Sequence, residues 1–394
     1  MNSFFDELGR KVLERWRREN FSLKAFPEIA HSSIEESSPS KQVNLDELIR
    51  DFLLDDEQPL QSQSDFGQPE LIVFHHDRFY IQILFWLEGT TDIHQHEFSG
   101  AFHVLAGSSI HAQFEFNDAC SVTPHMRIGN LQMKQIELLE TGRTIALTSG
   151  RDCIHSLFHL DTPSVTLVVR TQHDPGTGPQ FNYLPPHIAV DPMQVDNLTM
   201  RRKQLLDVVD ADFAHVVSEM VENLDFERGF HILNHAMIRL QELGDWEAVL
   251  EAFQQRHGDL ADGVADTLAE SLRRDVVASM RFHIEDPEHR FFLALLMNVL
   301  DRGEFMKLVA ERFPDQSPAD TIVGWAEELI EPDESGLMML DAVFPDSLEA
   351  SDQEQIDLFT SVLRHGLDDA ECPQEFAAVR ESLSNSVFRY LVNP

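Results

Sequence analysis

The chain has 394 residues, more than a single hydrophobic core usually holds, so at least two domains are expected. Its 68 acidic and 30 basic residues give a formal net charge of −38, while 42% of the residues are hydrophobic. A strongly negative protein repels phosphate backbones and anionic lipid surfaces, so we expect neither nucleic acid nor membrane as a partner.

Targeting and redox features favour the cytoplasm. The N-terminal stretch MNSFFDELGRKVLERWRREN is too charged for a signal peptide, and no apolar run approaches transmembrane length. The three cysteines, Cys120, Cys153 and Cys372, are widely separated and form no C-x-x-C pair. A disulfide framework is therefore not expected, and the sequence predicts a soluble cytoplasmic protein.

The first 69 residues have the pattern of a helical segment that packs on a larger unit. Apolar residues from Phe4 to Trp16 recur at helical spacing, which predicts an amphipathic helix. Residues 31–42, HSSIEESSPSKQ, are polar and predict a linker. A second short helix is predicted to begin at Asn44, because an N-x-x-E capping pattern starts there.

Short β-rich runs begin near residue 70. They are ELIVFHH, RFYIQILFWLEG, DIHQHE, AFHVLAGSSIHAQFEF, LQMKQIELLE, RTIALTSG, CIHSLFHL and SVTLVVRTQ. About eight strands bounded by turn residues, with no helical pattern among them, predict a small antiparallel barrel or sandwich. A connector rich in Pro and Gly, residues 173–192, closes this region, so the β-domain is expected to span residues 70–196.

The pattern is helical from residue 197 to residue 394. Residues 235–253 resemble residues 294–313, and an Ala-Asp-Thr sequence follows each. This weak repeat predicts stacked helical hairpins. No group of residues in this half suggests chemistry, so we expect it to serve packing, self-association or contact with a protein partner.

His94 and His96 are the first candidates for chemistry. Residues i and i+2 of a strand project from the same face, so the two imidazoles can share one metal ion. A facial metal site needs a third protein ligand and leaves positions open for substrate, water or oxygen. His155 is the best candidate for that ligand, because it begins a later strand after the turn TSGRD.

Three other residues are alternatives to His155. Asp92 shares strand parity with the histidine pair, and a site of two histidines and one carboxylate can use it or another acid. His103 and His159 are also near, although a bulge after Gly100 can reverse the parity of His103. In the absence of a metal site, all these histidines would be core or surface residues satisfied by hydrogen bonds.

The sequence GTTDIHQH, followed by a glycine-terminated strand, resembles the first motif of the cupin superfamily. His155 falls where the second motif supplies its histidine. The usual cupin glutamate is absent, since Gly100 and Ala101 stand in its place. Over about residues 71–172 the chain resembles the thiol dioxygenase branch, the cysteine dioxygenase-like proteins. The resemblance implies a cupin barrel and ferrous iron held by three neutral imidazoles, with a thiolate and dioxygen as reactants and a sulfinate as product.

The chain also departs from that branch. On the last strand, the family's outer serine, histidine and tyrosine correspond to Thr166, Val168 and Arg170, so only the hydroxyl remains. Ala101 corresponds to the cysteine that some members crosslink to tyrosine. Arg78 is the nearest counterpart of the arginine that binds the substrate carboxylate. Loss of such outer groups favours a different substrate or reaction on the same metal scaffold.

Strand parity suggests further pocket residues. Arg170 either reaches the cavity, where it offers a fork for a carboxylate or phosphate, or faces solvent near the strand end. Tyr80, Gln82 and Trp86 alternate on one face and either line the pocket or cover the barrel. The candidates are therefore His94, His96 and His155 as metal ligands, Thr166 and Arg170 as catalytic residues, and Arg78, Tyr80 and Trp86 as substrate-binding residues.

Three functions fit these observations. The first is a mononuclear non-haem iron(II) oxygenase of the thiol dioxygenase type, acting with dioxygen on a small thiol or related carboxylate-bearing molecule. The second is a metal- or ligand-binding cupin with a regulatory helical domain that contacts a protein partner. The third is a zinc enzyme, because three histidines also hold zinc and a zinc-bound water serves hydrolysis or isomerisation. We rank the oxygenase first because of the family resemblance.

Overall fold

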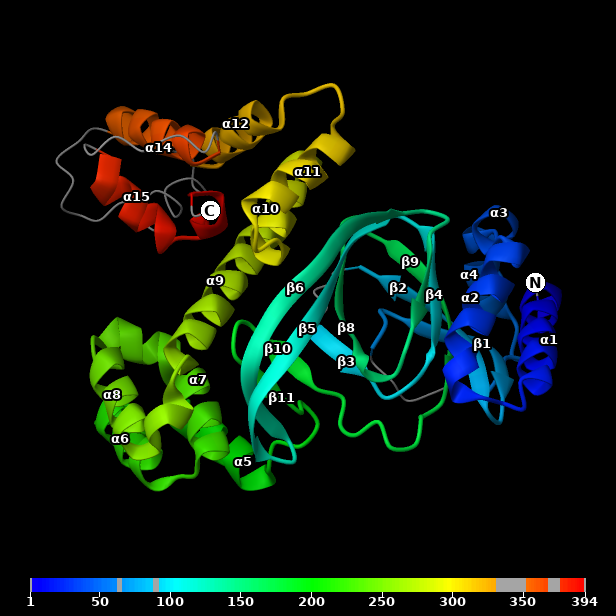
Figure 1. Ribbon diagram of the computed structural model, residues 1–394, viewed down its shortest axis with the longest axis horizontal. Coiled ribbons are helices and arrows are strands. Elements are labelled where there is room, and N and C mark those ends of the chain that lie inside the picture. Colours follow the sequence, from blue (N-terminus) through cyan, green and yellow to red (C-terminus); the bar gives the residue numbers. More distant parts are fainter. Residues whose placement is uncertain (1, 62–65, 88–91, 331–351, 368–375, 393–394) are drawn as a thin grey trace.

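A computed structural model describes residues 2–61, 66–87, 92–330, 352–367 and 376–392. N-terminal helices, an antiparallel β-barrel and an all-helical C-terminal region follow one another, with the barrel between the two helical parts (Figure 1). This arrangement confirms the predicted fold class, a cupin-like barrel with helices on both sides. Residues 88–91, which include the first three residues of the GTTDIHQH motif, lie outside the described residues.

The described residues form strands β1 (Glu70–His76), β2 (Phe79–Trp86), β3 (Ile93–His96), β4 (Gly100–Ala106), β5 (Ser108–Thr123), β6 (Met126–Glu140), β7 (Thr144–Leu147), β8 (Gly150–His159), β9 (Ser164–Thr171), β10 (Asn182–Leu184) and β11 (Ile188–Val190). They build a five-stranded sheet in the order β1-β2-β9-β4-β7 and a second sheet in the order β10-β11-β6-β5-β8-β3. The second sheet closes on itself because β10 also pairs with β3.

The connector predicted over residues 173–192 contains two of these strands. Tyr183 pairs with Ile93 of β3 and with Ala189 of β11, so this segment completes the barrel rather than only leading out of it. Both Phe181 and Tyr183 are buried. The strands were missed because each has three residues, too few for an alternating pattern to be recognised among the surrounding prolines and glycines.

The N-terminal helices are α1 (Asn2–Arg18), η1 (Leu23–Ala25), α2 (Phe26–Ser37), α3 (Pro39–Gln42) and α4 (Leu45–Leu54). The predicted amphipathic helix is α1, which buries Leu8 and Trp16, and Asn44 caps α4 by accepting the backbone N–H groups of Asp46 and Glu47. The predicted linker over residues 31–42 is wrong, because α2 and α3 occupy it. Apolar burial at helical spacing continues from Phe26 to Ile34, with Ser33 buried beside them, while Glu35 and Glu36 are exposed.

Both faces of the five-stranded sheet are covered. Phe79, Ile81 and Ile83 of β2 pack outward against the N-terminal helices, while Leu84 and Trp86 point into the barrel. This double burial explains why FYIQILFW reads as an almost continuous apolar run. The barrel interior therefore lies between the two sheets, and helices cover the outer face of the five-stranded sheet, as Figure 1 shows for α1 and α2.

The C-terminal helices are α5 (Asn197–Leu206), α6 (Phe213–Asn223), α7 (Phe226–Leu243), α8 (Trp246–His257), η2 (Gly258–Ala261), α9 (Val264–His283), α10 (Pro287–Asn298), α11 (Arg302–Arg312), α12 (Pro318–Ile330), α14 (Asp352–Leu367), α15 (Ala377–Ser384) and α16 (Arg389–Val392). The repeated segments form successive helices, α7 to α8 and α10 to α11, joined by short turns. Gly244 ends α7 with a positive φ of 76°. None of the described helices is long and apolar enough to cross a membrane.

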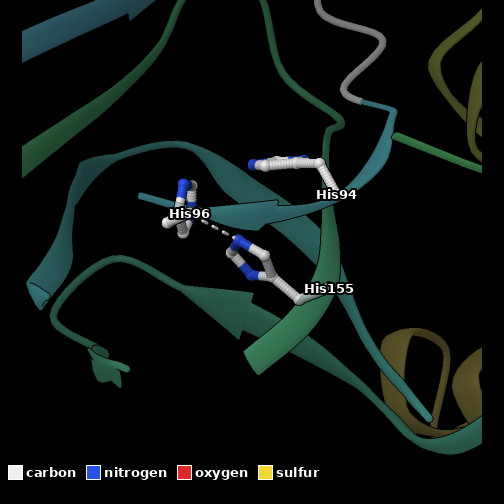
Figure 2. Close-up of side chains that lie close together, drawn as sticks. All are labelled: His94, His96 and His155. Carbon is white, nitrogen blue, oxygen red and sulfur yellow. Dashed lines mark hydrogen bonds between the residues drawn. The ribbon is translucent and has the colours of Figure 1, made fainter. Parts of the chain in front are cut away.

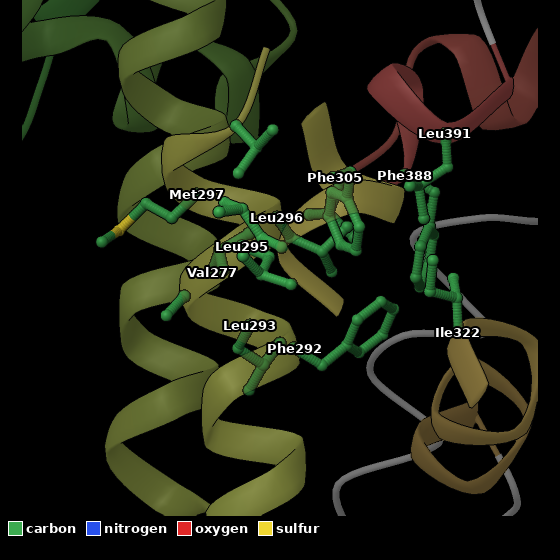
Figure 3. Packing of buried hydrophobic residues seen from close by; sticks show 14 of the residues in the cluster. Val277, Phe292, Leu293, Leu295, Leu296, Met297, Phe305, Ile322, Phe388 and Leu391 are labelled. Atoms are coloured by element: carbon green, nitrogen blue, oxygen red, sulfur yellow. The ribbon is translucent and has the colours of Figure 1, made fainter. Parts of the chain in front are cut away.

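One apolar cluster joins the helical region to the barrel. Ile110, Ile154 and Phe158 on the outer face of β5 and β8 belong to the same buried cluster as Val277 and Phe292 in the helices. Figure 3 shows its helical part, where Phe292 of α10 approaches Phe305 of α11 and Phe388. The helical region thus shares a core with the strands that carry the histidines.

Candidate metal centre

Three imidazoles converge inside the barrel from two neighbouring strands. His94 and His96 lie on β3 and His155 lies on β8, where it pairs with His94 in the antiparallel register. One ring nitrogen from each lies within 4.8 Å of the others, and all three residues are at most 5% exposed. Figure 2 shows the three rings turned toward one another. The group can therefore hold a metal ion inside the barrel.

Hydrogen bonds define which nitrogen of His94 faces the centre. Its Nδ1 lies 2.7 Å from the backbone oxygen of Asp92, which can only accept, so Nδ1 carries the proton. Its Nε2 is then an unprotonated acceptor, and it is buried with no hydrogen-bond partner in the described part of the chain. Such an orphaned acceptor is rare in a folded interior and fits a metal ligand.

An orphaned nitrogen alone does not define a metal site. His103 and His159 also have a buried Nε2 without a partner among the described residues. His103 binds Thr144 through Nδ1, and His159 binds Ser109 and stacks on Trp86. Neither reaches the group of three, so convergence distinguishes the metal-binding candidates from these two.

The remaining alternative ligand is Asp92. Its carboxylate accepts a hydrogen bond of 2.7 Å from the Asn182 amide, and its backbone oxygen orients His94. The group of three contains no carboxylate. Asp92 therefore acts here as a neighbour that positions a ring.

The ring nitrogen of His155 that faces away from the other two histidines contacts His111, a residue that was not among the sequence-predicted candidates. His155 Nδ1 lies 3.1 Å from His111 Nε2, and His111 Nδ1 lies 3.5 Å from a carboxylate oxygen of Glu137. His111 is 1% exposed. The stretch AFHVLAGSSIHAQFEF reads as one run, but Gly107, with a positive φ of 82°, divides it into β4 and β5. This glycine was the sequence feature that could have placed His111 on a strand of its own.

Burial keeps the three imidazoles neutral. Burial lowers the pKa of His94. Burial is also the main reason why the pKa values of His96 and His155 lie well below the usual value, and neighbouring histidines lower them further because they disfavour a second positive charge. A neutral imidazole retains a lone pair at neutral pH, which is the form that binds a metal. The electrostatics of the site therefore suit a cation from outside.

The three histidines lie on the wall of a small apolar pocket with a volume of about 40 Å³. The other lining residues are Phe66, Gln82, Leu84, Trp86, Phe98, Phe102, Leu147, Leu157, Thr166 and Val168, so no charged side chain is among the described lining residues. Trp86 donates its indole N–H to Thr166 Oγ1 over 3.2 Å. The Oε1 atom of Gln82 is buried without a partner among the described residues.

The structure brings Trp86 and Thr166 into the pocket but places the two arginines elsewhere. Arg170 lies with its guanidinium carbon 3.4 Å from the ring centroid of Phe98, and it donates to the backbone oxygens of Thr171 and Gln172. It therefore lies behind a lining residue. Arg78 is exposed in the β1–β2 turn, 4.4 Å over the ring of Phe21, and does not line the pocket.

Tyr80 also lies outside the pocket. Its ring lies 5.2 Å from the Arg170 guanidinium, and it borders a different hollow with Gln61 and Gln172. The reason is geometric: Tyr80 is at the far end of β2, where it pairs with Arg170, whereas Trp86 pairs with Ser164 at the other end. Strand parity gave the correct face but not the position along the strand.

Comparison with known proteins gives no family assignment. No protein-family model and no curated protein matches the chain. Matching solved structures include the DMSP lyase DddQ from Ruegeria pomeroyi DSS-3, with 14% identity over 44% of this chain and 93% of that chain and a TM-score of 0.24. TT1209 from Thermus thermophilus is 19% identical over 29% of this chain and 92% of that chain, with a TM-score of 0.19. The capsular polysaccharide assembling protein CapF from Staphylococcus aureus is 16% identical over 39% of this chain and 43% of that chain, with a TM-score of 0.23. At these scores the matches carry no argument about the site.

Proposed function

We propose that this protein is a mononuclear non-haem iron(II) oxygenase of the thiol dioxygenase type that oxidises a small thiol with dioxygen. The observation that carries the proposal is the convergence of three neutral, buried imidazoles, without a carboxylate, on the wall of an apolar pocket. Three protein ligands leave room for reactants, as a catalytic metal site requires.

His94, His96 and His155 would hold the metal. Iron(II), when bound, supplies redox chemistry and a place where a thiolate and dioxygen are held side by side. The chain's own residues do the rest. Phe98 and Phe102 exclude water from the pocket, and Thr166, whose oxygen already accepts from Trp86, retains its hydroxyl proton to donate toward a substrate atom.

Pocket size and charge favour a small neutral thiol over one that carries a carboxylate. A volume of about 40 Å³ accommodates only a few heavy atoms, since one water needs roughly 10–15 Å³ on the same measure. A carboxylate in this pocket would lack a cationic partner among the described lining residues, and burial of an unpaired charge is costly. Arg170 already donates to two backbone oxygens.

Zinc is the main alternative, because three neutral imidazoles also suit it and a zinc-bound water would serve hydrolysis or isomerisation. The discriminating experiment is metal analysis of protein purified without added metal, followed by reconstitution of the metal-free chain with iron(II) or zinc. Oxygen uptake is then measured with small thiols, with and without a carboxylate.

The expected result is iron-dependent oxygen uptake, a sulfinate product, and loss of both metal and activity in His155→Ala. The matched control is His125→Ala, since His125 lies at the surface and pairs with Asp191. A fully iron-loaded protein that consumes no oxygen with any thiol would overturn the dioxygenase proposal. Zinc in place of iron in the protein purified without added metal, with no oxygen uptake after iron(II) reconstitution, would favour the zinc enzyme instead.

A further inference from the structure

A series of polar contacts leads from the buried candidate metal centre to a part-exposed carboxylate. Glu137 of β6, His111 of β5 and His155 of β8 lie on three neighbouring strands of one sheet. Glu137 is directly opposite His111 in the register, and His155 is the diagonal neighbour, two residues from the partner of His111 on β8. Cross-strand neighbours at these positions are within side-chain reach.

The Glu137 carboxylate sets the direction of both hydrogen bonds in this series, the one from His111 and the one between His111 and His155. The hydrogen bond from His111 lowers the pKa of Glu137 against the opposing effect of burial, and Arg143, 3.3 Å from its second oxygen, adds to the effect. An ionised carboxylate only accepts, so His111 must carry its proton on Nδ1. In a neutral His111 the Nε2 is then an acceptor, so the proton of His155 lies on Nδ1.

The consequence is a single favoured tautomer of His155. With Nδ1 protonated, its Nε2 keeps a lone pair, and this is the nitrogen that faces His96 at 2.9 Å. The Asp92 backbone oxygen fixes His94 in the same tautomer. Two of the three rings are therefore preset by their neighbours to offer Nε2 to a cation.

We propose that His111 and Glu137 are positioning residues that hold His155 in its metal-binding tautomer and orientation. The inference rests on the proposed metal role of the three histidines and holds for iron or zinc. Outer partners of this kind change metal affinity by about 10- to 100-fold. A histidine that served only to fill the core would not set a proton position on a ligand.

The test uses the full chain, with Co(II) as the probe because its absorption spectrum reports coordination. His111→Leu is expected to weaken Co(II) affinity, measured against a competing chelator, by about 10- to 100-fold and to alter the spectrum. His111→Gln should recover most of the affinity, since its amide can accept from His155 and donate to Glu137. Glu137→Gln should cause a smaller loss, because a neutral amide can rotate and no longer fixes the direction of the hydrogen bonds.

His103→Leu is the matched control. It removes an equally buried histidine that is also hydrogen-bonded through Nδ1, to Thr144, but does not touch the three ligands. Its Co(II) affinity should equal that of the wild type. If His111→Leu does not fold, Glu137→Gln decides, and wild-type Co(II) affinity in that variant would then overturn the proposal. Glu137 is part-exposed, with a side chain 22% accessible, so this substitution disturbs the barrel least.

Wild-type affinity in both His111→Leu and Glu137→Gln would overturn the proposal. Equal weakening in His111→Leu, His111→Gln and His103→Leu would also overturn it, because that result indicates general damage to the barrel. A wild-type chain that binds no Co(II), iron or zinc would overturn the proposed function itself, which is a distinguishable failure.

Discussion

The Nε2 atoms of His96 and His155, 59 positions apart in the sequence, lie 2.9 Å from each other. Two lone pairs cannot face one another at this distance, so either one nitrogen carries a proton or a cation lies between them. The hydrogen bond between His111 and Nδ1 of His155 leaves Nε2 of His155 unprotonated. His96 is then the donor to this nitrogen in the metal-free protein. A metal must therefore replace this hydrogen bond, and its binding should be measurable as a gain in stability.

We predict that metal stabilises the wild-type fold and that His96→Ala abolishes the effect. A free metal concentration of 100 times Kd should add about 2.7 kcal/mol to the free energy of unfolding. Urea unfolding of metal-free protein with and without Co(II) measures this difference. The surface variant His125→Ala should keep the full gain, and an equal gain in His96→Ala would show that the metal binds elsewhere.

The ligand pair could be predicted from sequence because strand parity is local. Residues two apart on a regular strand share a face, and His94 and His96 do so although the β3–β8 register is irregular between them. His155 was predicted at the start of a strand after the turn TSGRD, but β8 already begins at Gly150, within that stretch, and His155 lies inside the strand, where it pairs directly with His94. The N-cap at Asn44 was equally local, as the side chain binds N–H groups two and three residues onward.

His111 could not be predicted in the same way, because its role depends on register between distant strands. Its contact with His155 spans 44 positions, and its contact with Glu137 spans 26. The β5–β6 hairpin contains irregularities such as the shift between Gln113 and Phe114, each of which changes which residues lie opposite. The alternation of side chains along β5 does not indicate which residues of β6 and β8 lie opposite His111.

The positions of the arginines were equally out of reach of sequence. Arg170 has the parity of Thr166, but Phe98 lies between it and the pocket, and that contact joins different strands of the fold. Arg78 was chosen by family register, whereas the chain places it in a turn against Phe21. Long side chains stack on aromatic rings that the sequence does not reveal as neighbours.

We predict that Gln82→Leu makes the metal-free protein more stable and weakens the binding of a thiol in the proposed reaction. The wild-type amide oxygen is buried without a described partner, and such a group costs about 1–3 kcal/mol. Leu removes that cost but also the hydrogen bond that the amide would offer a substrate. Urea unfolding and the KM for the best thiol measure the two effects. Destabilisation of the metal-free chain would show that the amide is already satisfied.

We predict acid sensitivity from His159, whose pKa burial lowers to about 3. An unfolded histidine has a pKa of about 6.5, so below that pH the unfolded chain binds a proton that the folded chain does not. Stability should therefore fall as the pH drops from about 6.5 toward 3, by about 2 kcal/mol from this residue between pH 7.5 and 5.0.

The check on this prediction is His159→Asn, in which the amide can retain the hydrogen bond to Ser109. The variant loses the stack on Trp86, so its stability at pH 7.5 should fall. The further decrease in its free energy of unfolding between pH 7.5 and 5.0, measured by urea unfolding, should be smaller than that of the wild type. An unchanged pH dependence would mean that the acid sensitivity arises from other groups.

We predict that Arg281→Met destabilises the barrel and the helical region together. Arg281 of α9 donates to the backbone oxygen of Leu160 over 3.2 Å, and its guanidinium lies 5.0 Å over the ring of Phe158. Met keeps the length of the side chain but leaves two part-buried backbone oxygens, those of Leu160 and Arg290, without this donor, at a cost of about 1–3 kcal/mol each. Because the two regions share one apolar cluster, fluorescence and circular dichroism should report a single urea transition, and its midpoint should shift to a lower urea concentration. The control is Arg256→Met, at an exposed position, which should leave the midpoint unchanged. Two separate transitions, with only the helical signal affected, would mean that the helices are an appendage rather than the outer wall of the barrel that carries His155.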